Sequence, residues 1–225
     1  MTFSILGRCP KTGMLGMAVS SSSPCVAARC AHARAGAGVV ASQNITDPRL
    51  GPKGLDLMAA DVSAEDALLE LLDGYPTAAY RQIGMIDAKG GKAWHSGGKT
   101  LGIHAVAQGE RCLALGNLLA QEGVPQAMAA GFEADSGESL ADHLLAAMTA
   151  ALEAGGEEGP VRSAGLVLVE GVAWPVADLR IDWSAGDPIA ELAALWELWR
   201  PQLRDYVTRA LDPSTAPAYG VPGDA

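Results

Sequence analysis

The sequence predicts an α+β fold in which two largely antiparallel sheets lie between layers of helices, a four-layer αββα sandwich. Three observations support this prediction. Short β-prone segments are joined by tight turns, which is typical of hairpins and therefore of antiparallel sheets. Helical segments come in blocks rather than alternating strictly with strands, which disfavours a Rossmann or barrel fold. Hydrophobic residues form 49% of the chain but aromatic residues only 5%, so small aliphatic side chains are expected to build the core.

The strands begin with an N-terminal hairpin. Residues 2–8 and 14–20 are β-prone, and Cys9-Pro10-Lys11-Thr12-Gly13 between them is typical of a tight turn. A second hairpin is expected around Ala88-Lys89-Gly90-Gly91. In chain order, the predicted strands are residues 2–8, 14–20, 38–43, 81–87, 92–96, 112–118, 164–170 and 178–182.

The predicted helices have recognisable ends. Ser63 supplies an N-cap hydroxyl, and Glu65 and Asp66 place carboxylates in the first turn that follows. Asp187 precedes Pro188, and proline is favoured at the first position of a helix. Helices are expected over residues 26–35, 54–60, 122–134 and 140–154, from residue 63 to the stop at residue 74, and from residue 187 onward.

The chain is expected to form one domain over residues 1–211, followed by a Pro/Gly-rich tail over residues 212–225. A domain of this size buries enough surface to fold without a disulfide or a metal. The four cysteines form no CxxC pair, so reduced thiols are expected. We find no motif for a cofactor or a metal, and we expect neither.

The net charge of −10 disfavours nucleic acid and anionic membranes as partners, because an acidic surface repels phosphate. No secretory signal follows Met1, and no apolar run reaches the ~20 residues of a membrane span. We therefore expect a cytoplasmic protein that acts on a small molecule. Trp196 and Trp199 in the last helix fit either a homodimer interface or core packing.

Thr2 is the first candidate for chemistry. Methionine aminopeptidase generally removes Met1 when the second residue is as small as threonine, which would leave a hydroxyl and a free α-amine on one residue. The α-amine has a pKa of ~7.7–8.0, so it can accept the hydroxyl proton near neutral pH. A threonine paired with its own N-terminal amine is a known type of nucleophile. A chain can also begin Met-Thr without any such role.

Two further segments carry polar groups that fit such a site. The serine loop containing Ser21 and Ser22 ends the strand that pairs with the strand starting at Thr2, so hydroxyls are expected around the N-terminus. Gly116-Asn117 ends an apolar strand, where an amide side chain and an open backbone N–H can form an oxyanion hole. An ordinary helix-capping loop and an ordinary turn are the alternatives.

Gln43, Asn44 and Arg49 form the last candidate group. The two amides close a predicted buried strand, and Arg49 follows in a loop rich in Gly and Pro. Together they can form a pocket wall in which Arg49 binds a substrate carboxylate. The alternative for Arg49 is a surface position.

Several segments in a fixed order resemble the domain-of-unknown-function 1028 family, which is grouped with the N-terminal-nucleophile (Ntn) hydrolases. They are Thr2-Phe3-Ser4-Ile5, Gly36-Ala37-Gly38-Val39-Val40-Ala41-Ser42-Gln43, Leu50-Gly51-Pro52-Lys53-Gly54-Leu55, Gly116-Asn117-Leu118-Leu119-Ala120 and Asp178-Leu179-Arg180-Ile181-Asp182. The resemblance implies the αββα fold of Ntn hydrolases, Thr2 as nucleophile and Asn117 as an oxyanion donor. Ser21, Ser22 and Asn44 follow as neighbours of the site.

The resemblance thus implies hydrolysis of an amide, imide or carbamoyl C–N bond in a small substrate. Ntn hydrolases such as proteasome subunits also use a lysine near the nucleophile, whereas the serine loop here contains none and the nearest are Lys11 and Lys53. A non-catalytic ligand-binding or assembly protein with the same fold is the first alternative. A thiol-dependent enzyme that uses Cys25, Cys30 or Cys112 is the second.

Overall fold

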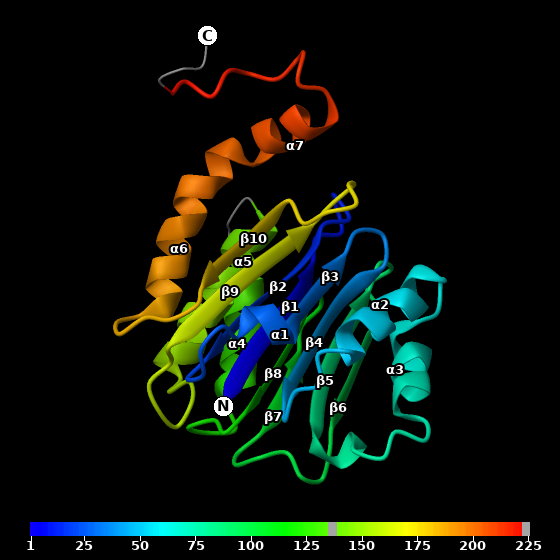
Figure 1. Cartoon of the computed structure of the whole chain (residues 1–225). Coiled ribbons are helices and arrows are strands. Elements are labelled where there is room, and N and C mark those ends of the chain that lie inside the picture. Colours follow the sequence, from blue (N-terminus) through cyan, green and yellow to red (C-terminus); the bar gives the residue numbers. More distant parts are fainter. Residues whose placement is uncertain (135–138, 222–225) are drawn as a thin grey trace.

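Two antiparallel sheets organise the computed structural model, which describes residues 1–134 and 139–221 (Figure 1). The last four residues of the predicted tail lie outside these ranges. The six-stranded sheet has the order β10-β9-β2-β1-β8-β7, with bounds Ala177–Ile181, Ser163–Val169, Leu15–Ser21, Thr2–Arg8, Cys112–Asn117 and Ala105–Gln108. The four-stranded sheet has the order β3-β4-β5-β6, with bounds Ala31–Arg34, Gly38–Asn44, Arg81–Asp87 and Lys92–Ser96. The prediction of largely antiparallel sheets is confirmed.

Side chains along β1 alternate between two apolar clusters, because successive residues of a strand point to opposite faces. Leu6 belongs to the cluster that also contains Val39 of the other sheet, so this cluster lies between the sheets. Phe3 and Ile5 belong to the cluster under α4 (Val124–Ala134), α5 (Leu140–Glu153) and α6 (Pro188–Trp199). The even-numbered residues of β1 therefore face the space between the sheets.

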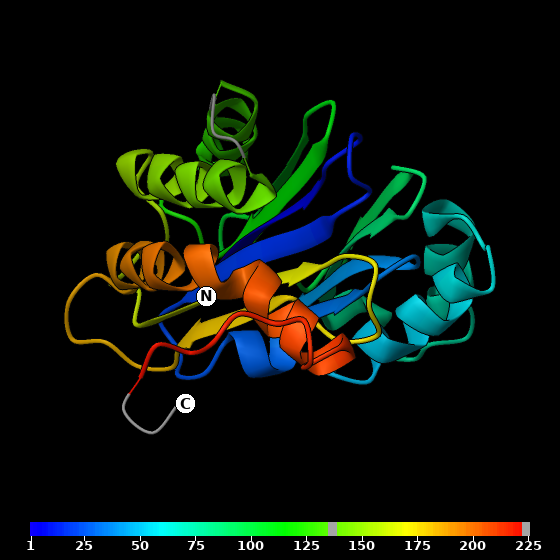
Figure 2. The ribbon, with the colours of Figure 1, turned by 90° about the horizontal axis from the view of Figure 1, so that it is seen from above.

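The helices α2 (Leu50–Ala59) and α3 (Ala64–Leu72) pack on the four-stranded sheet (Figure 2). A third apolar cluster joins these two helices to strand residues such as Val40 and Met85. The predicted N-cap of α3 is confirmed, because the hydroxyl of Ser63 accepts the backbone N–H of Asp66 at 3.1 Å.

The helix predicted over residues 26–35 is wrong. Only Ala27–Cys30 forms a helical turn, α1, and the chain then continues as β3. The alanines in this segment favour a helix, but β3 pairs with β4 in the register Ala31 to Ala41, and this pairing overrides local propensity. The prediction also missed β7, which pairs with β8 as the edge strand of the six-stranded sheet.

The helix predicted from residue 187 onward is two helices. After α6, a short 3₁₀ turn contains Pro201 and leads into α7 (Leu203–Leu211), which extends away from the sheets in Figure 1. Trp196 is buried and donates its indole N–H to Asp142 at 2.9 Å, while Trp199 donates to the carbonyl of Val176 at 3.0 Å. Both indoles are therefore engaged within the chain, as the core-packing alternative predicts. No helix in the described part of the chain is both long and apolar enough to cross a membrane.

Candidate functional site

Thr2 is the first residue of β1 and lies in the middle of the six-stranded sheet. It is directly opposite Asn117 on β8, and the β1–β2 register places Phe3 opposite Ser20, so Ser21 flanks Thr2 on the other side. Thr2 is 5% exposed, and its side chain faces the space between the sheets. The sequence prediction that Thr2, Ser21 and Asn117 lie together is consistent with this geometry.

Hydroxyl groups surround the Met1–Thr2 peptide bond. Thr2 Oγ1 lies 3.4 Å from Ser21 Oγ, and both hydroxyls are within hydrogen-bonding distance of the Met1 carbonyl. Ser21 Oγ in turn accepts the backbone N–H of Ser23 at 3.1 Å. The serine loop therefore fixes the position of the chain's first peptide bond.

Three amide side chains form a buried network beside these hydroxyls. Gln82 Oε1 accepts Gln43 Nε2 at 2.8 Å and Asn117 Nδ2 at 3.0 Å. Gln43 Oε1 accepts the Ser4 hydroxyl at 2.8 Å, so the network joins both sheets. Gln82 Nε2 donates to the Gly116 carbonyl at 3.0 Å. Gln82 was missed by the sequence analysis because a lone glutamine in a strand carries no motif.

Asn117 has unused hydrogen-bonding capacity. Its Nδ2 uses one N–H on Gln82, which leaves the second N–H of the amide group. Its Oδ1 is buried and has no hydrogen-bond partner among the described residues. A buried orphan acceptor is costly in a folded protein and calls for an explanation. The Asn117 amide can therefore still donate one hydrogen bond and accept at least one.

Glu157 is the second group at this end of β1 that the sequence analysis missed. It follows α5 in a segment that pairs with the chain just after β8: Leu119 forms a bridge with Glu157, and Glu158 N–H donates to Leu118 O at 3.0 Å. Its carboxylate accepts the backbone N–H of Ser22 at 3.1 Å. Burial raises the pKa of Glu157 to about 7, although the nearby N-terminal ammonium acts to lower it.

Of the other predicted neighbours, Ser22 contacts Glu157 and Asn44 joins two loops. Asn44 has a φ of 72°, a left-handed conformation that asparagine tolerates better than most residues. Its Nδ2 donates to Tyr80 O at 2.6 Å, and its Oδ1 accepts the N–H of Leu101 at 3.2 Å. Asn44 therefore closes the end of β4 rather than joining the amide network.

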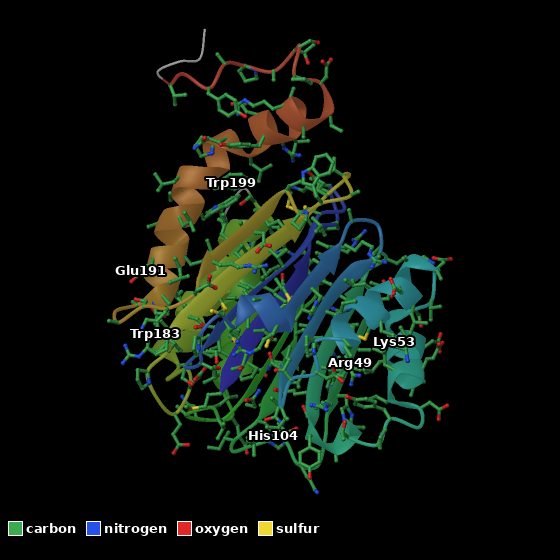
Figure 3. All side chains as sticks on the ribbon, viewed as in Figure 1. Arg49, Lys53, His104, Trp183, Glu191 and Trp199 are labelled. Atoms are coloured by element: carbon green, nitrogen blue, oxygen red, sulfur yellow. The ribbon has the colours of Figure 1, made fainter. Side chains whose placement is uncertain are left out.

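Arg49 lies on the surface at the start of α2, as Figure 3 shows. Its guanidinium makes two close contacts with Asp47, at 2.9 Å (Nε to Oδ1) and 2.7 Å (Nη2 to Oδ2). Tyr75 also donates its hydroxyl to Asp47 at 2.7 Å. These donors hold the pKa of Asp47 well below its usual range. The charge of Arg49 is already paired, which weakens its case as a substrate clamp.

Replacing Asp47 by asparagine should lower the free energy of unfolding at pH 7 by about 1–3 kcal/mol, because the hydrogen bonds that Arg49 and Tyr75 donate to its buried, charged carboxylate are weakened or lost. A carboxyl with a depressed pKa stabilises the fold above its ordinary value of 3.8 and loses this effect as the pH falls. Urea unfolding at pH 7 and pH 3 should therefore show a difference between wild type and D47N that shrinks at the lower pH. An equal difference at both values would contradict this account.

The thiols of two candidate cysteines are poor nucleophiles. Burial raises the pKa of Cys30, and burial together with Glu133 raises the pKa of Cys112 to about 12. Cys25 is exposed. Among the described residues, no group of three His, Cys, Asp or Glu side chains is placed to hold a metal ion.

Met1 covers Thr2 in this form of the chain. Met1 is 39% exposed, whereas Thr2 below it is almost fully buried. Two cavities lie elsewhere. One of about 170 Å³ is lined by Arg8, at the opposite end of β1, and by Arg111. A shallower one of about 480 Å³ lies beside α3 and is lined by Trp94. Neither cavity includes Thr2.

Comparison with known proteins identifies a family and a similar solved structure. The model of a family of unknown function, DUF1028, matches residues 2–192. The crystal structure of a DUF1028 protein from Silicibacter pomeroyi matches with a TM-score of 0.83 and 29% sequence identity, over 91% of this chain and 94% of that chain. A search of curated proteins found no match.

Proposed function

Because the chain belongs to the DUF1028 family, whose function is unknown, we propose an activity from the site itself: hydrolysis of a C–N bond in a small amide, imide or carbamoyl compound, with Thr2 as nucleophile. The observation that carries this proposal is the position of the Thr2 hydroxyl, in contact with the peptide bond that precedes it and beside a buried amide network. The proposed fold type is the four-layer αββα sandwich of Ntn hydrolases, which suits two stacked sheets flanked by helices.

In the proposed reaction, cleavage of the Met1–Thr2 bond frees the α-amine of Thr2. This amine takes the proton of the Thr2 hydroxyl while Oγ1 attacks the substrate carbonyl, and it then returns a proton to the leaving nitrogen. The free N–H of Asn117, with a backbone N–H, stabilises the negative oxygen of the tetrahedral intermediate. Water then hydrolyses the acyl-enzyme, and no cofactor takes part in these steps.

Neither Lys11 nor Lys53 lies beside the proposed site. Lys11 lies in the turn after β1, at the end of the strand opposite to Thr2. Lys53 is exposed on α2, which packs on the other sheet, and Figure 3 shows it beside Arg49. In the proposed reaction, neither of these lysines assists the α-amine of Thr2.

The first test combines the mass of the intact protein with a panel of small amides. A native protein that begins at Thr2 and releases ammonia or an amine from at least one amide, imide or carbamoyl compound is the expected result. A chain that begins at Thr2 but hydrolyses no member of a broad panel, and is not acylated by reactive esters at Thr2, would contradict the proposal.

A non-catalytic ligand-binding or assembly protein is the second candidate, favoured by one observation. With Met1 present, its carbonyl occupies both hydroxyls and Thr2 is closed off from solvent. A native protein that keeps Met1 would favour this candidate, because the proposed base is then absent.

A further inference from the structure

We propose that Glu157 binds the α-ammonium group at the start of the chain and so positions the amine of Thr2 beside the Thr2 hydroxyl. This assignment rests on the proposed cleavage of the Met1–Thr2 bond. Glu157 is a positioning residue in this scheme: it acts through the amine and does not contact the substrate.

The strand register places Glu157 across the open end of β1. On one side of β1, the register puts Ser22 next to Met1, and the carboxylate of Glu157 accepts the Ser22 N–H. On the other side, residues 156–158 pair with residues 118–120, which continue from β8. Glu157 therefore bridges the two neighbours of β1 at the point where the chain begins.

Burial gives the second argument. Glu157 is only 4% exposed, and glutamate is almost never buried unless it is paired with a positive charge. Among the described residues, the N-terminal ammonium of Met1 favours the ionised form of Glu157. The backbone N–H of Ser22 alone leaves the carboxylate without a counter-charge. The ammonium at the chain start fills this role.

After removal of Met1, an α-ammonium group remains close to Glu157. The new α-amine lies one residue further into β1, about 3.8 Å along the chain. It stays between Ser21 on β2 and Asn117 on β8, where the orphan Oδ1 of Asn117 can accept one of its N–H groups. Glu157 and Asn117 then hold the amine from two sides, which fixes its direction toward the hydroxyl.

The test measures the pKa of the Thr2 α-amine without any substrate. Processed protein is pulse-labelled with acetic anhydride across a pH series, and the N-terminal peptide is quantified by mass spectrometry. An adjacent carboxylate favours the charged amine, so E157Q should lower the pKa of the amine by about one pH unit. The control E158Q makes the same chemical change on the exposed neighbour and should leave the amine unchanged.

An amine that titrates identically in wild type, E157Q and E158Q would overturn the proposal. Labelling does not require turnover, so a protein that hydrolyses no amide still tests Glu157. If an amide substrate is found, the acid limb of its pH–rate profile should shift to lower pH in E157Q but not in E158Q. A purely structural role would lower the rate without moving that limb.

A second measurement covers the case in which E157Q does not fold. Acetylation of the α-amine in wild-type protein removes the counter-charge of Glu157. The acetylated protein should then have a lower melting temperature than the unmodified protein at pH 8, where Glu157 is ionised, and the same melting temperature at pH 5. If the acetylated and unmodified proteins melted at the same temperature at pH 8 as well as at pH 5, the proposed ion pair would be contradicted.

Discussion

Replacing Thr2 by alanine should lower hydrolysis of any amide substrate by roughly 10³-fold or more, because removal of a nucleophile abolishes the covalent route. The fold should survive, since the change deletes one hydroxyl and one methyl group at the end of β1. Alanine is also small enough to allow removal of Met1. The loss of rate should therefore appear in kcat at an unchanged melting temperature.

Thr2→Ser is the matched variant for this experiment. It keeps a hydroxyl and an α-amine on the same residue, so it should retain turnover and form an acyl-enzyme that mass spectrometry can detect. If the alanine variant hydrolysed the substrate at the wild-type rate, the nucleophile would have to be a different group, and the exposed Cys25 would be the next to block by alkylation.

Replacing Gln82 by leucine should lower the free energy of unfolding by about 4 kcal/mol. Gln82 is fully buried, and its side chain makes four hydrogen bonds: it accepts from Gln43 and Asn117, and it donates to Ser96 and to the carbonyl of Gly116. Leucine leaves these groups without their partner, and each buried unsatisfied group costs about 1–3 kcal/mol. Urea denaturation at pH 7 measures the change.

Gln108→Leu provides the control for Gln82. Gln108 is also a strand residue, at the end of β7, but it is exposed, so the same substitution should change stability by less than about 0.5 kcal/mol. In the Gln82 variant, Asn117 also loses the hydrogen bond that orients its amide, so turnover should be lost as well. Equal urea midpoints for the two variants would show that the network contributes nothing to stability.

The elements that sequence reasoning located well are those whose signals are local. The turn at residues 9–13 fixed the first hairpin, and hydroxyl or carboxylate caps fixed the starts of α3 and α6. Segment 26–35 was misread because its alanines suit a helix, while the pairing of β3 with β4 is a contact that no local pattern encodes. The edge strand β7 was also missed. Its four residues show no clear alternation between buried and exposed side chains, so only the pairing with β8 identifies it as a strand.

The residues of the candidate site likewise fall into those that sequence signals identified and those that only the folded chain brings together. Thr2 and Ser21 lie together as expected, because a hairpin brings the start of one strand beside the end of the next. Asn117 lies opposite Thr2 through the long-range pairing of β1 with β8, which no hairpin encodes, and it was named from the family resemblance and its place at a strand end. Gln82 and Glu157 come from a strand of the other sheet and from a loop after a helix, so only the folded chain shows that they belong. Arg49 was expected to face a pocket, yet Asp47, two residues earlier, is its partner.

The position of the chain's beginning has a practical consequence for anyone who purifies this protein. β1 starts inside the six-stranded sheet, between β2 and β8, with Glu157 across its end. An affinity tag fused before Thr2 would convert the proposed base into an amide nitrogen and abolish the reaction while the protein still folds. The far end of the chain follows α7, which Figure 1 shows on the opposite side of the molecule, and is the place for a tag.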